Sequence, residues 1–242
     1  MLQWVRSIIY IIQITIAMPI IGLVFAPWAM FSKAGAYKAC RTYAGWCIWS
    51  ARWLVGLRCE VRGEVPQGEV LVAAKHQSFL DIMVIFHALP RAKFIMKREI
   101  HWMPVIGQYT KRMEMIAVDR GKRGKAIAKM IDDVHAGRME GGQLVIYSQG
   151  TRVAPGAYIP YKVGTSVLYT QLGQPCVPVA TNAGYFWPRR GLYRRPGVAV
   201  VEFLKPIEPG LSKEVFMSEL ETRVETASTE LLSETDWSGP GA

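Results

Sequence analysis

The apolar stretch from Ile8 to Met30 contains no charged residue, and it constrains the architecture more than any other feature. A helix of this length can cross a bilayer or lie deep in one. Because Pro19 and Pro27 interrupt the stretch, the helix either kinks or forms a hairpin with the next segment that enters and leaves on one face. We therefore expect this part of the chain to be embedded in a membrane.

The next segment, Tyr37 to Leu57, predicts a helix at the lipid headgroup boundary. In it and beside it, tryptophans mix with basic residues, which is typical of a membrane interface: Trp46, Trp49, Trp53, Lys38, Arg41, Arg52 and Arg58. A cleaved signal peptide is disfavoured, because the apolar core is too long and no small-residue cleavage site follows. We expect residues 1–58 to form a membrane-anchoring helical motif.

The distribution of positive charge predicts which side of the membrane the rest of the chain occupies. Lys33, Lys38 and Arg41 follow the apolar stretch, whereas only Arg6 precedes it. This asymmetry places the downstream part in the cytoplasm, and a same-side hairpin gives the same answer. The expected location is the inner (cytoplasmic) membrane, with the downstream domain on its cytoplasmic face.

From Cys59 onward, short apolar runs alternate with helical patterns, which indicates an α/β fold with a mixed sheet flanked by helices. Residues 58–63 open the sheet, and further strands are expected at 70–74, 91–96, 115–119, 143–147, 176–181 and 198–203. Helices are expected at 79–89, 122–136, 162–172 and 213–232. No linker is evident, so residues 59–242 are predicted to form one domain.

The chain is basic, with 29 Lys and Arg against 19 Asp and Glu, a formal net charge of +10. Acidic partners are expected, and the apolar N-terminus favours anionic membrane lipids over nucleic acid, for which no zinc-finger or helix-turn-helix pattern is present. The loop Arg189–Arg195 suits the membrane interface or the phosphates of a bound ligand. The four cysteines have no metal-ligand spacing, and we predict no metal site.

Lys75 to Asp81 lie between a predicted strand and a predicted helix, with Ser78 as the helix N-cap. In one helix, a five-residue step would turn about 140° past a full revolution, so His76 and Asp81 can meet only across a loop. From the third helical position Asp81 can reach back and hold one imidazole nitrogen protonated, leaving the other to accept a proton. Alternatively, Ser78 and Asp81 form a capping box and His76 is simply nearby.

Three further blocks follow in order. They are Lys97-Arg98-Glu99-Ile100 with Pro104, Gly107 and Val118-Asp119-Arg120; Ser148-Gln149-Gly150-Thr151-Arg152; and Val177-Pro178-Val179-Ala180. Together with His76 and Asp81, they resemble the four blocks of the glycerolipid acyltransferases, the family with a His-x4-Asp motif, and most of all the bacterial 1-acyl-sn-glycerol-3-phosphate acyltransferases. The resemblance extends from about Ala73 to Asn182.

The resemblance implies transfer of a fatty acyl group from a thioester, acyl-CoA or acyl carrier protein, to the sn-2 hydroxyl of lysophosphatidic acid, giving phosphatidic acid. His76 would be the general base and Asp81 would orient it, with no acyl-enzyme and no bound cofactor. Arg152, with Gly150 and Thr151, would grip the substrate phosphate. Lys97 would be a second cation and Arg120 a third.

The resemblance also suggests that backbone N–H groups near Val177-Pro178-Val179 stabilise the oxyanion. Pro178 itself has no N–H, so a neighbour would have to donate. The alternative is that this segment is simply a buried strand.

Two departures from the family pattern leave the acceptor open. Lys75 stands where the family often has asparagine, and Ser148-Gln149 stands where it usually has proline and glutamate. Gln149, a predicted substrate-binding residue, can donate as well as accept hydrogen bonds. A different lysolipid such as a lyso-aminolipid, or glycerol 3-phosphate, is therefore an alternative acceptor. An alternative of another class is a non-catalytic membrane lipid-binding or scaffold protein.

Overall fold

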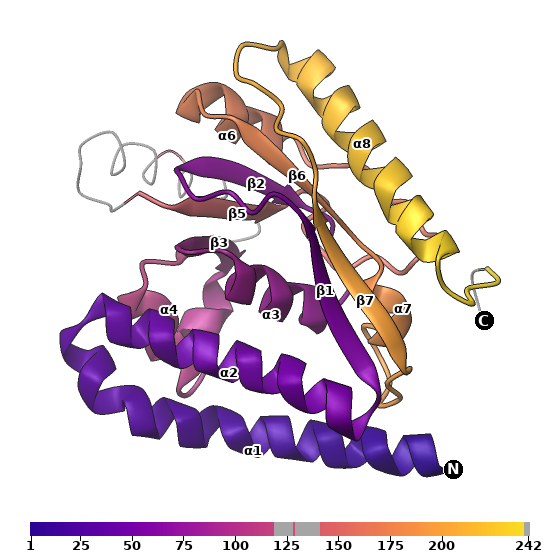
Figure 1. The fold of residues 1–242 in the computed structure, drawn as a ribbon. Helices are drawn as coiled ribbons and strands as arrows, with labels where there is room; N and C mark the ends of the chain where they lie inside the picture. Colours follow the sequence, from indigo (N-terminus) through magenta and orange to yellow (C-terminus); the bar gives the residue numbers. More distant parts are fainter. Residues whose placement is uncertain (119–127, 129–140, 240–242) are drawn as a thin grey trace.

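The computed structural model describes residues 1–118, 128 and 141–239. Its centre is a seven-stranded sheet with the strand order β1-β7-β6-β2-β5-β3-β4 (Figure 1). The strands are β1 (Leu57–Gly63), β2 (Val70–Ala74), β3 (Ala92–Lys97), β4 (Ile116–Val118), β5 (Gln143–Tyr147), β6 (Cys176–Thr181) and β7 (Gly197–Phe203). The predicted α/β class is therefore confirmed.

The sheet is mixed, as predicted. Strands β6, β2, β5, β3 and β4 are parallel neighbours, whereas β7 runs antiparallel to β6 and parallel to β1. Because parallel strands end at the same edge, the carboxyl ends of β6, β2, β5 and β3 lie together. In an open α/β sheet this edge is where ligands usually bind.

Helices cover both faces of the sheet (Figure 1). Strand β2 shows why, since its successive side chains point to opposite faces. Val72 and Ala74 belong to the core that includes α3 (Phe79–Ala88), whereas Leu71 and Ala73 belong to the core beneath α6 (Gly164–Leu172) and α8 (Lys213–Ser233). Strands that are apolar on both faces need a helical layer on each side.

The N-terminal segment folds as a helical hairpin. Helix α1 (Leu2–Phe31) continues through both of its prolines, and only Ser32 separates it from α2 (Lys33–Leu54). Helix α2 lies between α1 and α3 in Figure 1. Of the two arrangements expected from the prolines, the structure therefore has the hairpin.

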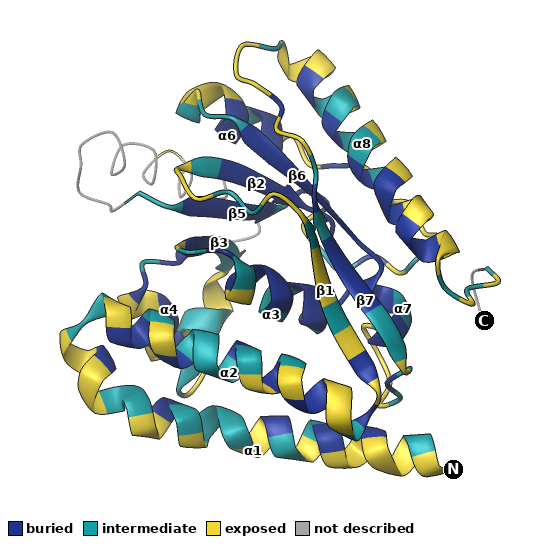
Figure 2. Cartoon of the chain, viewed as in Figure 1, coloured by how far each residue is buried: buried dark blue, intermediate teal, exposed yellow. Residues whose placement is uncertain are grey.

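Helix α1 is apolar on its outer face as well as its inner one. Ile12, Ile16, Ile20 and Leu23 are exposed on one side of the helix, which is coloured largely as exposed and half-buried in Figure 2. Among the described residues, α1 is the one helix long and apolar enough to cross a membrane. Such a surface indicates membrane association.

Most elements lie within a few residues of their predicted bounds, and β2, β5 and β6 match fully. Three short helices were not predicted: η1 (Arg98–Trp102), α4 (Ile106–Arg112) and α7 (Ala183–Phe186). Helix α2, predicted from Tyr37 to Leu57, begins earlier, at Lys33, and ends at Leu54, because Leu57 already belongs to β1. The predicted helix at 122–136 and the end of the predicted strand at Asp119 lie outside the described residues.

Replacement of Phe216 should show how strongly α8 depends on its buried face. The Phe216 side chain is fully buried and stacks on Tyr169, with ring centroids 3.8 Å apart. We expect Phe216→Ala to lower the free energy of unfolding by about 3–5 kcal/mol. Val215 is 53% exposed, so Val215→Ala is the control and should change it by less than about 0.5 kcal/mol. Denaturant unfolding of both variants in one detergent checks this, and equal effects would contradict it.

Candidate active site

The loop between β2 and α3 is organised by the start of the helix. Ser78 is the N-cap, and its Oγ accepts a hydrogen bond from the Leu80 N–H at 3.1 Å. In return, Asp81 Oδ2 accepts from the Ser78 N–H at 2.7 Å and from the Gln77 N–H at 2.8 Å. This is the capping box that the sequence offered as one alternative, and it fixes the Asp81 carboxylate beneath the loop.

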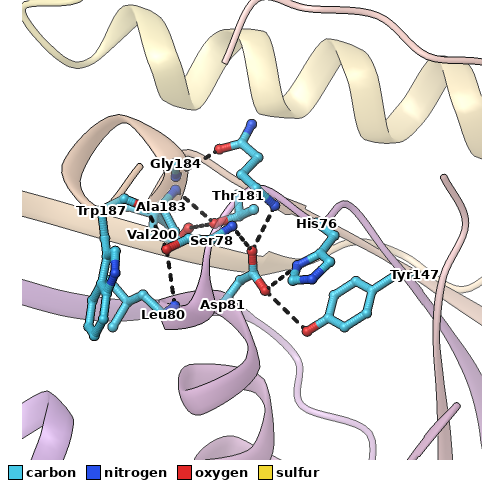
Figure 3. Close-up of polar contacts among 11 residues, drawn as sticks. His76, Ser78, Leu80, Asp81, Tyr147, Thr181, Ala183, Gly184, Trp187 and Val200 are labelled. Carbon is cyan, nitrogen blue, oxygen red and sulfur yellow. Dashed lines mark hydrogen bonds and ion pairs between the residues drawn. The ribbon is translucent and has the colours of Figure 1, made fainter. Parts of the chain in front are cut away.

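The second oxygen of the same carboxylate faces His76. Asp81 Oδ1 lies 2.9 Å from His76 Nδ1 and accepts a hydrogen bond from the Tyr147 hydroxyl at 3.1 Å (Figure 3). The predicted contact across the loop is thus confirmed. The capping box and the His76 pair were considered as alternatives, but one carboxylate forms both.

The hydrogen bonds around Asp81 determine which imidazole nitrogen carries the proton. An ionised carboxylate can only accept, so His76 Nδ1 must donate to it. In the neutral ring, Nε2 then keeps its lone pair. The His76 side chain is 13% exposed, whereas that of Asp81 is fully buried. The arrangement is suited to removing a proton from a hydroxyl group that approaches Nε2.

Tyr147, the last residue of β5, was not identified from the sequence. Its ring stacks on the His76 ring at a centroid distance of 3.9 Å and an interplanar angle of 19°. Burial, together with the charge of Asp81, raises the pKa of Tyr147 well above its ordinary value, so the phenol stays protonated and donates. Tyr147 lies next to Ala74 because β5 pairs with β2, and the sequence alone does not reveal which strands are neighbours.

The loop that carries His76 is held by other elements on every side. The His76 carbonyl accepts from the Val153 N–H at 2.8 Å, and the Lys75 N–H donates to the Val179 carbonyl at 2.9 Å. Gln77 Oε1 accepts from the Gly184 N–H of α7 at 3.0 Å, and Ser78 Oγ donates to the Trp187 carbonyl at 2.7 Å (Figure 3). These contacts hold the loop before any substrate binds.

The third block follows β5 and lies next to His76. The bond from the Val153 N–H to the His76 carbonyl places the preceding residue, Arg152, beside the loop. Among the described residues, no hydrogen bond or ion pair engages the half-buried Arg152 guanidinium. Gly150 has a φ of 68°, in the left-handed region that favours glycine, so it allows the sharp turn after β5. The Arg189 guanidinium also approaches, donating to the Arg152 carbonyl at 3.3 Å.

Gln149 points into the protein and supports the loop that carries Arg152. It is almost fully buried, and its Nε2 donates to the Ile159 carbonyl at 3.1 Å. Its Oε1 is buried without a hydrogen-bond partner among the described residues. A carboxylate in this place could not donate to Ile159, so glutamine is suited to this packing. A direct contact with substrate remains a prediction.

The structure describes some of the remaining predicted residues but not all of them. Lys97 ends β3 at the same sheet edge and is exposed, two strand spacings or about 10 Å from β2. Arg120 lies outside the described residues. Val177, Pro178 and Val179 form the interior of β6 and are buried, as expected for a buried strand, and a role of nearby N–H groups in stabilising the oxyanion stays a prediction. In the part of the chain that is described, no group of three or more His, Cys, Asp or Glu residues could hold a metal ion.

Several known proteins are similar to this chain. A 1-acyl-sn-glycerol-3-phosphate acyltransferase from Pseudomonas aeruginosa is 29% identical over 161 residues, which are 64% of this chain and 63% of that protein. The mouse 1-acyl-sn-glycerol-3-phosphate acyltransferase alpha is 29% identical over 163 residues, or 65% and 57%. This chain thus spans less than two thirds of the length of these relatives.

The crystal structure of the 1-acyl-sn-glycerophosphate (LPA) acyltransferase PlsC from Thermotoga maritima has a similar fold. The TM-score is 0.79, and the match covers 97% of both chains at 19% sequence identity. The family model described as acyltransferase matches residues 57–182, from the start of β1 to just past β6, which is more than half of the chain. It includes the His76 loop and the Arg152 loop, and the chain therefore belongs to the acyltransferase family.

Proposed function

We propose that this protein is a membrane-bound enzyme of phospholipid synthesis, which transfers a fatty acyl group from an acyl thioester to the sn-2 hydroxyl of lysophosphatidic acid. The observation that carries the proposal is the pair of His76 and Asp81, with Nδ1 engaged at 2.9 Å and Nε2 left to act as a base. The names of the relatives support the choice of substrate. The product is phosphatidic acid.

In the proposed reaction His76 acts as the general base. Its Nε2 takes the proton of the acceptor hydroxyl while that oxygen attacks the thioester carbonyl, and Asp81 stabilises the imidazolium that forms. The tetrahedral intermediate then collapses, the carbon–sulfur bond breaks, and the imidazolium returns the proton to the leaving thiolate. The donor is acyl-CoA or acyl carrier protein, which is consumed as a co-substrate.

The acceptor phosphate is assigned to the third block. The Arg152 guanidinium can form two parallel hydrogen bonds with a phosphate, and the turn at Gly150 and Thr151 allows the backbone to approach. Lys97 lies farther along the same sheet edge and supplies a second positive charge, with Arg120 as a third. This arrangement puts the phosphate beside the loop that carries the base.

We further propose that α1 lies in the cytoplasmic leaflet of the inner membrane without crossing it. Gln3 near its start donates to the carbonyls of Val55 and Arg194, while Tyr109 of α4 donates to the Gly22 carbonyl. The helix, about 45 Å long, is therefore attached alongside the domain instead of extending away from it. In this view residues 1–58 anchor the catalytic domain, residues 59–242, and the basic surface attracts anionic lipids.

Gln149 supports an alternative acceptor with the same chemistry. Because Gln149 holds the loop that carries Arg152 through the Ile159 carbonyl, replacement of the usual glutamate can alter how a headgroup is held. A lyso-aminolipid or glycerol 3-phosphate is then the acceptor. The intact pair of His76 and Asp81 argues against the other alternative, a non-catalytic lipid-binding or scaffold protein.

Replacement of the base is the first test. We expect His76→Ala to lower kcat by about 100- to 10,000-fold, because proton removal from the hydroxyl is lost, while membrane association is unchanged. The assay offers acyl-CoA or acyl carrier protein with lysophosphatidic acid, glycerol 3-phosphate and a lyso-aminolipid. Unchanged turnover in His76→Ala would show that His76 is not the general base. An inactive wild-type protein would favour the scaffold alternative.

Arg152→Ala should weaken binding of a phosphate-bearing acceptor. Loss of charged hydrogen bonds worth about 1.5–3 kcal/mol should raise the KM for lysophosphatidic acid by about 10- to 100-fold. With monoacylglycerol, which has no phosphate, the KM should not change. Arg58→Ala is the control, because Arg58 is exposed on the edge strand β1. An equal rise in KM for both acceptors would exclude Arg152 as the phosphate ligand.

Tyr147→Phe should show whether Asp81 needs its fourth hydrogen bond. The substitution keeps the ring beside His76 and removes one bond worth about 1 kcal/mol, so kcat should fall by about 5-fold with KM unchanged. Tyr169→Phe is the control, since the Tyr169 hydroxyl donates to the Glu208 carbonyl on the α8 side of the sheet. Steady-state kinetics distinguish the two, and a wild-type kcat in Tyr147→Phe would count against a positioning role.

A further inference from the structure

Lys75 directly precedes His76, but its side chain lies on the other face of the sheet. Its Nζ forms an ion pair with Glu225 Oε2 of α8, and only 3% of the Lys75 side chain is exposed. His76 instead turns to Asp81 at the start of α3. The two residues therefore connect the loop to opposite helical layers.

The second oxygen of Glu225 holds a different loop. Glu225 Oε1 accepts a hydrogen bond from the Tyr161 hydroxyl at 2.9 Å. Burial and the charge of Glu225 raise the pKa of Tyr161 far above its ordinary value, so the hydroxyl remains a donor. Tyr161 closes the segment that begins after β5, since the next residue, Lys162, donates its N–H to the Ser148 carbonyl at 2.8 Å. This segment carries Arg152.

We propose that Glu225 is a positioning residue which fixes the distance between the His76 loop and the Arg152 loop by holding each with one oxygen of the same carboxylate. The inference rests on the proposed function, in which one loop supplies the base and the other the phosphate ligand. The two oxygens of a carboxylate are covalently fixed, so the Lys75 and Tyr161 anchors cannot move apart independently. A small misplacement of reacting groups can cost about 100-fold in rate.

Glu221, one turn earlier on α8, provides a matched control. Its carboxylate faces Tyr158, which belongs to the same segment as Tyr161 but is largely exposed, and it raises the pKa of the Tyr158 hydroxyl. Glu221→Gln therefore alters a contact between α8 and this segment without affecting Lys75. Glu225→Gln and Tyr161→Phe are the test variants. The second removes one hydrogen bond and keeps the buried ion pair, so it is expected to fold even if the first does not.

The kinetic test asks whether Glu225 and Arg152 act together. With lysophosphatidic acid, we expect Glu225→Gln to lower kcat/KM by about 10-fold, but by no more than about 2-fold when Arg152 is already alanine. Tyr161→Phe should show the same dependence with a smaller loss, and Glu221→Gln should have wild-type activity. The same fold-loss in both backgrounds would mean that Glu225 only stabilises the fold, and it would overturn the proposal.

Hydrogen exchange of the full-length protein in detergent provides a readout that does not need activity. Glu225→Gln should accelerate amide exchange in residues 75–81 and also in 149–162, whereas Glu221→Gln should leave residues 75–81 unchanged. Faster exchange in α8 alone would overturn the inference. If the wild-type enzyme transfers no acyl group, the proposed function fails, while the exchange result still decides whether Glu225 couples the two loops.

Discussion

The candidate site depends on one buried anion, the Asp81 carboxylate. Removing a charge from water is costly in free energy. Here hydrogen bonds from two backbone N–H groups, the Tyr147 phenol and the His76 imidazole replace those that water would make. The carboxylate also lies at the positive end of α3. The interactions that begin this helix are thus the same ones that orient His76, so the site and the fold of the β2–α3 unit are inseparable.

The parts of this site that are local in sequence could be predicted. Ser78 and Asp81 follow a capping pattern over four residues, and the buried strand β2 is recognisable as a continuous apolar run. Tyr147 and Glu225 could not be identified in this way. Their contacts depend on β5 lying beside β2 and on α8 covering the opposite face, and periodicity does not reveal which elements are neighbours.

The sequence also left open whether the apolar N-terminal helix kinks or forms a hairpin with the next segment. A proline indicates an interruption of the helix but does not say which of the two follows. The structure resolves it through packing, in which Tyr10 of α1 donates a hydrogen bond to the Cys47 carbonyl of α2 at 3.0 Å. Tyr10 also packs edge-on against Trp187, whose carbonyl accepts from Ser78 Oγ. Trp187 therefore contacts both the apolar helix α1 and the N-cap of α3, and the two parts of the chain share a core.

The edge of the sheet explains how both helical layers contribute to one site. Within a strand, neighbouring side chains point to opposite faces and cannot act on the same substrate. Beyond the ends of β2 and β5 the chain leaves this alternation, so His76 can pack against α3 while Lys75 reaches α8. Arg152 can then lie beside His76 although Tyr161, at the far end of its segment, is held on the α8 side. Groups fixed by two separate cores are thus brought together only where the strands end.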